Sequence, residues 1–161
     1  MNLVIVNRQR ARKIDTRFLR QITTALLNEL KIEEVELGIT LVGAQEMARV
    51  NWQFLRHEGS TDVITFDHRE ERETEAEKQK AIHGELYICL DDAMAQAMRF
   101  RTSWQSEMVR YVVHGVLHLL GYDDRESQLK RHMKRAENRL VRWLEHRFSL
   151  AQLSRAVKLV A

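Results

Sequence analysis

Residues 103–120, SWQSEMVRYVVHGVLHLL, form an apolar segment that leaves the chain few ways to fold. The second half of the segment is apolar on nearly every face, so the helix that it predicts must run through the middle of the protein. Thr102 or Ser103 can cap its start, and Gln105 is placed for a capping box behind Thr102. Gly121 follows the last apolar residue and can end the helix. We therefore predict one buried central helix.

Two histidines, His114 and His118, interrupt this apolar segment. They lie one helical turn apart on a single face, which lets two imidazoles converge on one ion, as in helical zinc motifs. Gly115 costs roughly 1 kcal/mol in a helix interior relative to alanine, so it serves either close packing or ligand access. Beyond the helix, a returning chain can bring Asp123 or Asp124 to the same ion. The pattern predicts a metal site with two histidines and one carboxylate.

The rest of the chain indicates an α+β fold in a single domain over residues 1–161, without internal repeats or a linker. Short apolar, β-branched runs predict four strands of a mixed sheet, and helical periodicity predicts about five helices. Residues 68–82 are charged and predict an exposed loop or frayed helix. The predicted strands are 2–7, 35–43, 62–67 and 84–90, and the predicted helices are 15–30, 44–55, 91–100, 103–120 and 127–148.

Two helices have apolar stripes that predict their buried faces. The first follows a cap at Asp15 or Thr16, and the last is the long basic helix near the C-terminus. Cys89 lies in an apolar run and is expected in the core, since a buried free cysteine behaves as a small hydrophobe. The stripe of the first helix contains Phe18, Leu19, Ile22, Ala25, Leu26 and Leu30; that of the last contains Leu129, Met133, Ala136, Leu140, Trp143 or Leu144, and Phe148.

Positive charge is unevenly distributed along the chain. Residues 125–161 contain ten Lys and Arg against three acids, and 19 of the 26 basic residues of the chain are arginine, whose planar fork suits phosphate. This distribution favours an anionic partner such as RNA, although solvated helix faces would also explain it. No apolar run approaches the ~20 residues that span a bilayer. The start lacks the apolar segment of a signal peptide, so we expect a cytoplasmic protein without membrane contact.

At residues 114–124, HGVLHLLGYDD, the sequence resembles the YbeY-type rRNA maturation factors, a bacterial family of metal-dependent endoribonucleases. Their signature is H-G-x-L-H-L-x-G-Y-D-H, and the chain matches it in register except at its last position, Asp124. NWQFLRHEGSTDVITF resembles the family block N-x(3)-L-R-x(4)-T-D-V-L-S-F, and HGELYICLDDA resembles the strand that follows. The motifs cover roughly residues 50–125.

The resemblance implies one zinc ion held by His114, His118 and Asp124, with Asp123 as the rival ligand. Two histidines and a carboxylate leave a fourth position for water, the pattern of a catalytic zinc site. It implies that Arg56 binds and stabilises the phosphate, so that Arg56, His114 and His118 are the expected catalytic residues. The implied activity is hydrolysis of single-stranded RNA.

The same resemblance implies a biological setting. The expected role is maturation of the 3′ end of small-subunit rRNA and ribosome quality control, with rRNA and the small ribosomal subunit or its assembly factors as partners. Thr61 and Asp62 match the same block as the arginine and are expected to brace the strand beside the site. Tyr122 is expected to pack.

Three other functions fit parts of the pattern. A ribosome assembly factor with a structural metal would bind RNA without cleaving it. A zincin-type metallopeptidase is disfavoured, because Gly115 stands where H-E-x-x-H enzymes have their catalytic glutamate. An iron oxygenase also uses two histidines and a carboxylate, but usually on a β-sandwich rather than on one helix.

Overall fold

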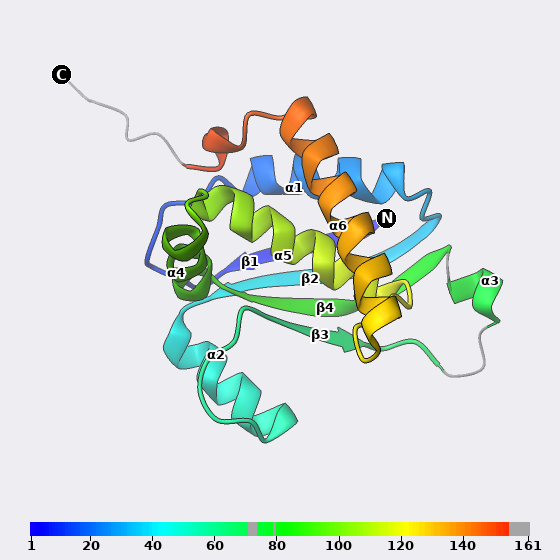
Figure 1. Ribbon diagram of the computed structural model, residues 1–161, viewed down its shortest axis with the longest axis horizontal. Helices are drawn as coiled ribbons and strands as arrows, with labels where there is room; N and C mark the ends of the chain where they lie inside the picture. The colour runs from blue at the N-terminus through cyan, green and yellow to red at the C-terminus, as the bar shows by residue number, and fades with distance from the viewer. Residues whose placement is uncertain (71–73, 79, 155–161) are drawn as a thin grey trace.

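A computed structural model describes residues 1–70, 74–78 and 80–154 as a mixed sheet covered by helices (Figure 1). The strands are β1 (Asn2–Asn7), β2 (Glu34–Val42), β3 (Val63–Asp67) and β4 (Ala81–Cys89), in the spatial order β1-β2-β4-β3. The pairs β1–β2 and β2–β4 are parallel, and β3 runs antiparallel to β4. The predicted α+β class and mixed sheet are confirmed.

Helices precede and follow these strands. They are α1 (Thr16–Glu29), α2 (Ala44–Val50), α3 (Glu75–Lys78), α4 (Leu90–Phe100), α5 (Trp104–Leu119) and α6 (Ser127–Arg147), together with a π-helical turn, η1 (Asn51–Leu55), and a 3-10 turn, η2 (Leu150–Leu153). The segment predicted as one helix over 44–55 is thus an α-helix that continues as a π-helix. None of the described helices combines the length and the apolar character needed to cross a membrane.

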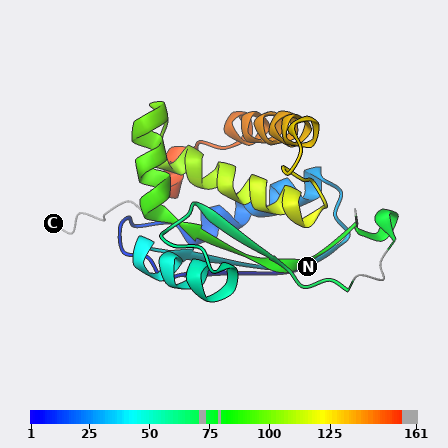
Figure 2. The same ribbon diagram turned by 60° about the horizontal axis from the view of Figure 1, so that its bottom comes forward.

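Helix α5 lies between the sheet and α6, as the layers in Figure 2 show. It contacts β3, β4, α4 and α6, and Val109, Val113 and Val116 along it are completely buried. The prediction of a buried central helix is therefore confirmed. The main core joins α5 to α1, α6 and one face of the sheet, while a smaller cluster packs α2 on the other face.

Close packing explains the glycine inside α5. A Cβ on Gly115 would lie 2.5 Å from Cδ2 of Leu86, a buried residue of β4. Gly84 on the same strand serves the same purpose, since its Cβ would meet the backbone carbonyl of Phe66 and the side chain of Leu119. The helix thus lies close to the sheet where the two histidines are placed.

The helix caps agree in part with the sequence. Asp15 accepts a hydrogen bond from the Phe18 amide at 3.1 Å, and Ser103 accepts one from the Ser106 amide at 3.1 Å. The predicted capping box behind Thr102 is wrong. Gln105 instead donates to Oγ of Ser154 at 2.8 Å, because η2 docks beside the start of α5.

The predicted stripe of α6 is right for its middle and wrong at its start. Met133, Leu140 and Leu144 are buried, but Leu129 remains 41% exposed because the first turns of α6 project past the core. The predicted exposed loop or frayed helix over 68–82 contains the short helix α3 and ends too late, since β4 begins at Ala81. Cys89 is buried, as expected. Residues 155–161 of the tail lie outside the described residues.

Candidate metal centre

The histidines project from the face of α5 that the core leaves open. The ring centroids of His114 and His118 lie 4.7 Å apart, and about a quarter of each side chain is exposed. The other faces of the helix are buried, so these side chains meet the solvent along one line. This geometry follows from their spacing of four residues.

The turn after α5 returns the chain to the histidines. Gly121 has φ +99, its amide donates to the His118 carbonyl at 3.0 Å, and the Tyr122 amide donates to the Leu117 carbonyl at 3.0 Å. This is the Schellman arrangement, which favours glycine at the left-handed position. The chain then brings Oδ2 of Asp124 to 3.6 Å from Nε2 of His118.

The two neighbouring aspartates face different partners. Asp123 accepts from Nε of Arg125 at 2.7 Å and pairs with its Nη2 at 2.6 Å. These hydrogen bonds lower the pKa of Asp123 to about 2. The structure therefore groups Asp124, and not Asp123, with the histidines, while Tyr122 stacks on His132 with ring centroids 5.3 Å apart.

The three grouped side chains suit a divalent ion. One ligand atom from each of His114, His118 and Asp124 lies within 4.8 Å of the others. Ligands of one tetrahedral zinc ion at about 2.1 Å lie roughly 3.4 Å apart, so small side-chain shifts would complete the set. Burial lowers the pKa of His118, and repulsion from His114 adds to the effect. A neutral imidazole keeps the lone pair that a metal requires.

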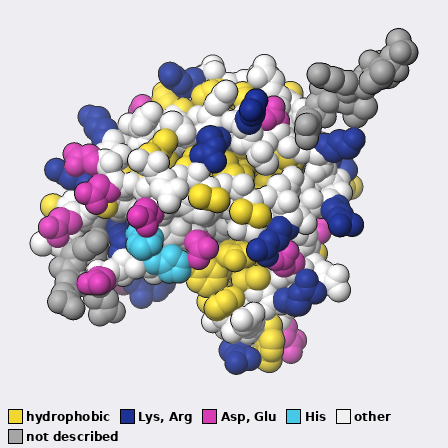
Figure 3. Space-filling model, turned by 180° about the vertical axis from the view of Figure 1, so that it is seen from behind, with side chains coloured by type: hydrophobic (Ala, Val, Ile, Leu, Met, Phe, Trp, Pro, Cys, Tyr) yellow, Lys and Arg dark blue, Asp and Glu magenta, His cyan; other side chains and the backbone are white. Residues whose placement is uncertain are grey.

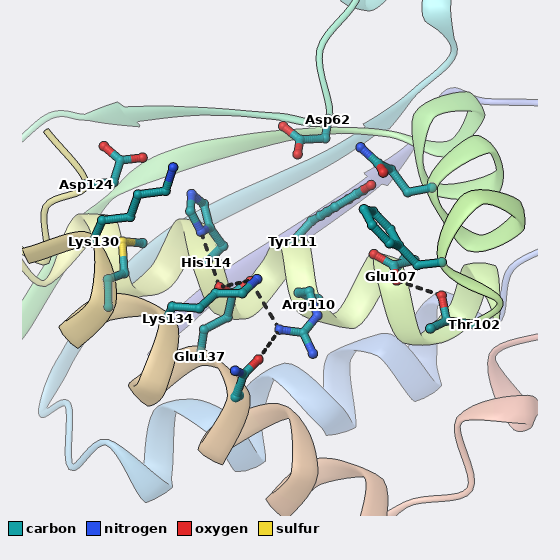
Figure 4. A pocket seen from close by; sticks show the side chains of 14 residues that line it. Asp62, Thr102, Glu107, Arg110, Tyr111, His114, Asp124, Lys130, Lys134 and Glu137 are labelled. Carbon is teal, nitrogen blue, oxygen red and sulfur yellow. Dashed lines mark hydrogen bonds and ion pairs between the residues drawn. The ribbon is translucent and has the colours of Figure 1, made fainter. Parts of the chain in front are cut away.

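Sequence reasoning missed Glu137, a buried acid behind the metal group. Its Oε2 lies 3.9 Å from Nδ1 of His114, and Nη1 of Arg110 lies 3.5 Å from its Oε1 (Figure 4). Burial raises the pKa of Glu137, yet contacts with His114, Lys134 and Arg110 outweigh it and hold the pKa below its ordinary value. Position 137 follows Met133 by four residues, so periodicity places it on the buried stripe but does not show that its carboxylate faces His114.

Sequence reasoning also assigned no role to Arg69, which ties the end of α5 to the sheet. Its side chain is 6% exposed and donates to the carbonyl oxygens of Ala81 and Leu119. Two nitrogens of the same guanidinium bind the carboxylate of Asp67, at 3.1 and 2.8 Å. This arginine therefore fixes the helix end from which the turn to Asp124 departs.

Arg56 lies near the cleft but not in it. It follows the π-helical turn with φ +55, and its guanidinium carbon lies 5.6 Å from the ring centroid of Trp52. Its neighbour Leu55 lines a cleft of about 480 Å³ together with His114, His118 and Asp124. Figure 3 shows hydrophobic side chains over the projecting lobe of α2 and η1, beside histidine and acidic side chains.

Asp62 borders the same cleft from the start of β3. Its Oδ1 accepts from the Val63 amide at 2.8 Å and from Oγ1 of Thr61 at 3.4 Å. These bonds brace the strand, as the sequence predicts for both residues.

The fold and the site together define a small α+β protein with a candidate single-ion centre on its central helix. Residues 4–145 match the family described as Endoribonuclease YbeY, and the chain belongs to this family. The resemblance in the sequence is thereby confirmed.

Relatives and a solved structure agree with this membership. The chain is 32% identical over 126 residues to Endoribonuclease YbeY of Chlorobium phaeovibrioides, covering 78% of this chain and 80% of that one. It is also 32% identical over 144 residues to the protein of the same name from Chlorobium luteolum, covering 89% and 98%. The solution structure of TM1509 from Thermotoga maritima matches with a TM-score of 0.64 at 26% identity, covering 90% of both chains.

Proposed function

We propose that this chain is a metal-dependent endoribonuclease that hydrolyses phosphodiester bonds of single-stranded RNA with one zinc ion held by His114, His118 and Asp124. The observation that carries the proposal is the convergence of these three ligand groups on one wall of an open cleft. Three protein ligands leave a coordination position for water or substrate, as in catalytic zinc sites. The name that the relatives share, Endoribonuclease YbeY, supports RNA as the substrate.

The residues around the centre prepare it for hydrolysis. When bound, the ion would supply Lewis-acid chemistry, acidifying water and polarising a phosphoryl oxygen. Glu137 faces Nδ1 of His114, which leaves the other ring nitrogen of that histidine for the ion. Partial burial lowers the pKa of His118, which favours its neutral ring near pH 7. Both histidines would then serve as ligands of the ion.

Arg56 is proposed to bind the scissile phosphate. Its side chain is exposed and lies over Trp52, one residue after Leu55 in the cleft wall. A guanidinium can pair with two phosphate oxygens at once. Its charge would offset the charge that develops on a phosphate held at the centre during hydrolysis.

The wider role that we propose is maturation of the 3′ end of small-subunit rRNA and ribosome quality control, by a single domain over residues 1–161. The small ribosomal subunit or its assembly factors would be the partners, and the protein would work in the cytoplasm. The excess of basic residues in 125–161 supports contact with a polyanion, because phosphate neutralisation supplies most of the affinity for RNA.

A cleavage assay on one sequence in two forms, single-stranded and duplex, tests the proposal. We expect the zinc-loaded protein to cleave the single strand, and both metal removal and His118→Ala to abolish cleavage. Glu145→Gln, an exposed change on α6, serves as the control and should retain activity. Binding of RNA without any cleavage by the zinc-loaded protein would instead favour the assembly factor with a structural metal.

A further inference from the structure

A second cavity adjoins the candidate metal centre. It has a volume of about 460 Å³, lies among α4, α5 and α6, and shares Asp62, His114 and Asp124 with the metal cleft (Figure 4). Cavities of ~300–1,000 Å³ are typical of small-ligand sites. A ligand in this cavity would therefore lie directly beside the ion.

Two buried polar groups in its wall have no hydrogen-bond partner among the described residues. Tyr111 is only 5% exposed, and its hydroxyl is unpaired; the same holds for the buried Oε1 of Gln96. A buried polar group without a partner is destabilising. Such groups are rare in native structures and are accounted for by a functional role or by a bound water, ion or ligand. The pair indicates a ligand that can accept from a hydroxyl and donate to an amide oxygen.

The edges of nucleobases have this combination of neighbouring donors and acceptors. Phe100, which is 59% exposed, lines the same cavity and offers a face on which an unstacked base can lie. Lys130 and Lys134 line the cavity from α6, one helical turn apart, and supply positive charge for a phosphate.

Four acids line the cavity, namely Asp62, Glu107, Asp124 and Glu137, and each has another partner or role. Oδ1 of Asp62 accepts from the Val63 amide, and Asp124 would bind the ion. Glu107 accepts from Oγ1 of Thr102 at 2.6 Å. Glu137 lies 3.5 Å from both Arg110 and Lys134. The charge of Glu137 is therefore offset by two cations, and the phosphate would enter beside Lys130.

We propose that this cavity holds one nucleotide of the single-stranded RNA, with its base between Phe100 and the polar pair Tyr111 and Gln96 and its phosphate toward Lys130. The inference rests on the proposed function and specifies how its substrate is bound. It places an unstacked nucleotide next to the scissile bond. A requirement to unstack one base also explains a preference for single strands.

Binding of adenosine 5′-monophosphate to the metal-loaded protein, compared with ribose 5-phosphate, tests the cavity without a cleavable bond. In ligand-observed NMR, Tyr111→Phe should bind adenosine 5′-monophosphate about three- to tenfold more weakly than wild type, as expected for one hydrogen bond. Its affinity for ribose 5-phosphate should not change. Tyr87→Phe removes the same atom from β4, outside the cavity, and should match wild type.

Thermal unfolding distinguishes a ligand-binding role of the Tyr111 hydroxyl from a structural one. If the hydroxyl stabilised the fold, its removal would lower the Tm. Because the Tyr111 hydroxyl lacks a partner among the described residues, Tyr111→Phe should leave the Tm unchanged or raise it. A lower Tm with unchanged nucleotide affinity would overturn the inference. Gln96→Leu is a second variant and should also weaken nucleotide binding.

Cleavage assays on the same proteins separate the two proposals. Suppose that wild type cleaves RNA, but wild type and Tyr111→Phe bind adenosine 5′-monophosphate equally well. This result would overturn the cavity inference and leave the proposed function intact. The expected loss of nucleotide affinity, without RNA cleavage by wild type, would support the cavity and contradict the endoribonuclease.

Discussion

Nε2 of His118 lies 3.6 Å from Oδ2 of Asp124, a distance that two ligands of one metal ion can share. Residue spacing does not select Asp124 over its neighbour Asp123, and in the sequence only the resemblance to the family signature favours it. The selection comes from the turn at Gly121 and from Arg125, which holds the carboxylate of Asp123. One basic residue after the motif thus leaves the second aspartate available to the ion.

Replacing either aspartate by alanine should therefore have unequal effects on metal binding. We expect Asp124→Ala to lower zinc affinity by at least tenfold, because it removes one of the three proposed ligands. Asp123→Ala should change the affinity much less and act mainly on the turn. Competition with a zinc-binding dye measures both. Equal losses, or a larger loss for Asp123→Ala, would contradict the assignment.

Glu137→Gln should weaken zinc binding without removing a ligand. The carboxylate faces Nδ1 of His114 at 3.9 Å, and such outer carboxylates orient a histidine and raise its basicity. Their loss typically costs 10–100-fold in metal affinity. The measurement is the zinc dissociation constant at a temperature where wild type and variant are both folded.

The matched control for this prediction is Glu145→Gln, an equal change at an exposed position of the same helix. It should bind zinc as wild type does. An unchanged dissociation constant in Glu137→Gln, together with lower thermal stability, would show that Glu137 serves only to balance the charges of Arg110 and Lys134.

Local spacing explains what the sequence could predict. The capped apolar helix, its two histidines and the glycine that ends it depend on neighbours within a few residues, and all lie as expected. Glu137 and Arg69 depend on contacts between segments far apart in the chain, and periodicity alone does not reveal which polar side chain such contacts bury. Gln105 shows the same limit, since Ser154 competes for its amide.

The two glycines at the contact of α5 with the sheet should differ in their tolerance of alanine. Gly84→Ala meets the backbone carbonyl of Phe66, which cannot move without disturbing the ladder. Gly115→Ala meets only the tip of Leu86, and alanine regains about 1 kcal/mol of helix propensity. Overpacking costs about 1–3 kcal/mol, so Gly84→Ala should lose the most stability and Gly115→Ala less.

Gly38→Ala is the control for this pair, because its nearest new contact is an ordinary 3.4 Å to Cγ of Glu85. Urea denaturation gives the free energy of unfolding for all three variants. A Gly84→Ala protein as stable as Gly38→Ala would show that the helix and the sheet are less closely packed than the structure indicates.

The ion pair of Asp67 and Arg69 predicts an acid-sensitive contribution to stability. Burial raises the pKa of Asp67, but hydrogen bonds from Arg69 outweigh it and leave the pKa below its ordinary value. A carboxyl whose pKa is lower in the folded state stabilises the fold above its unfolded pKa of about 3.9 and loses this effect as pH falls through the folded pKa. The side chain is 42% exposed, so the contribution is about 1 kcal/mol or less.

Between about pH 5 and 7 the carboxyl is ionised in both the folded and the unfolded state. The free energy of unfolding of wild type should therefore exceed that of Asp67→Asn by a constant amount in this range. The difference should shrink below about pH 4. Chemical denaturation across this range measures it. A difference that widens on acidification would contradict the prediction, because it would mean that folding disfavours the ionised carboxylate of Asp67.

The salt dependence of RNA affinity should show which basic side chains of α6 contact the RNA phosphates. If phosphates contact Lys130 and Lys134 at the cavity, replacing both by alanine should reduce the slope of log affinity against log salt by roughly 0.7 per lost contact. Arg135 and Arg139 have the same spacing on the same helix and are exposed, but they do not line the cavity. Their double alanine variant removes equal charge from a different face, so its slope should stay close to that of wild type. Equal reductions in both variants would indicate that RNA contacts the whole basic helix rather than the side next to the metal centre.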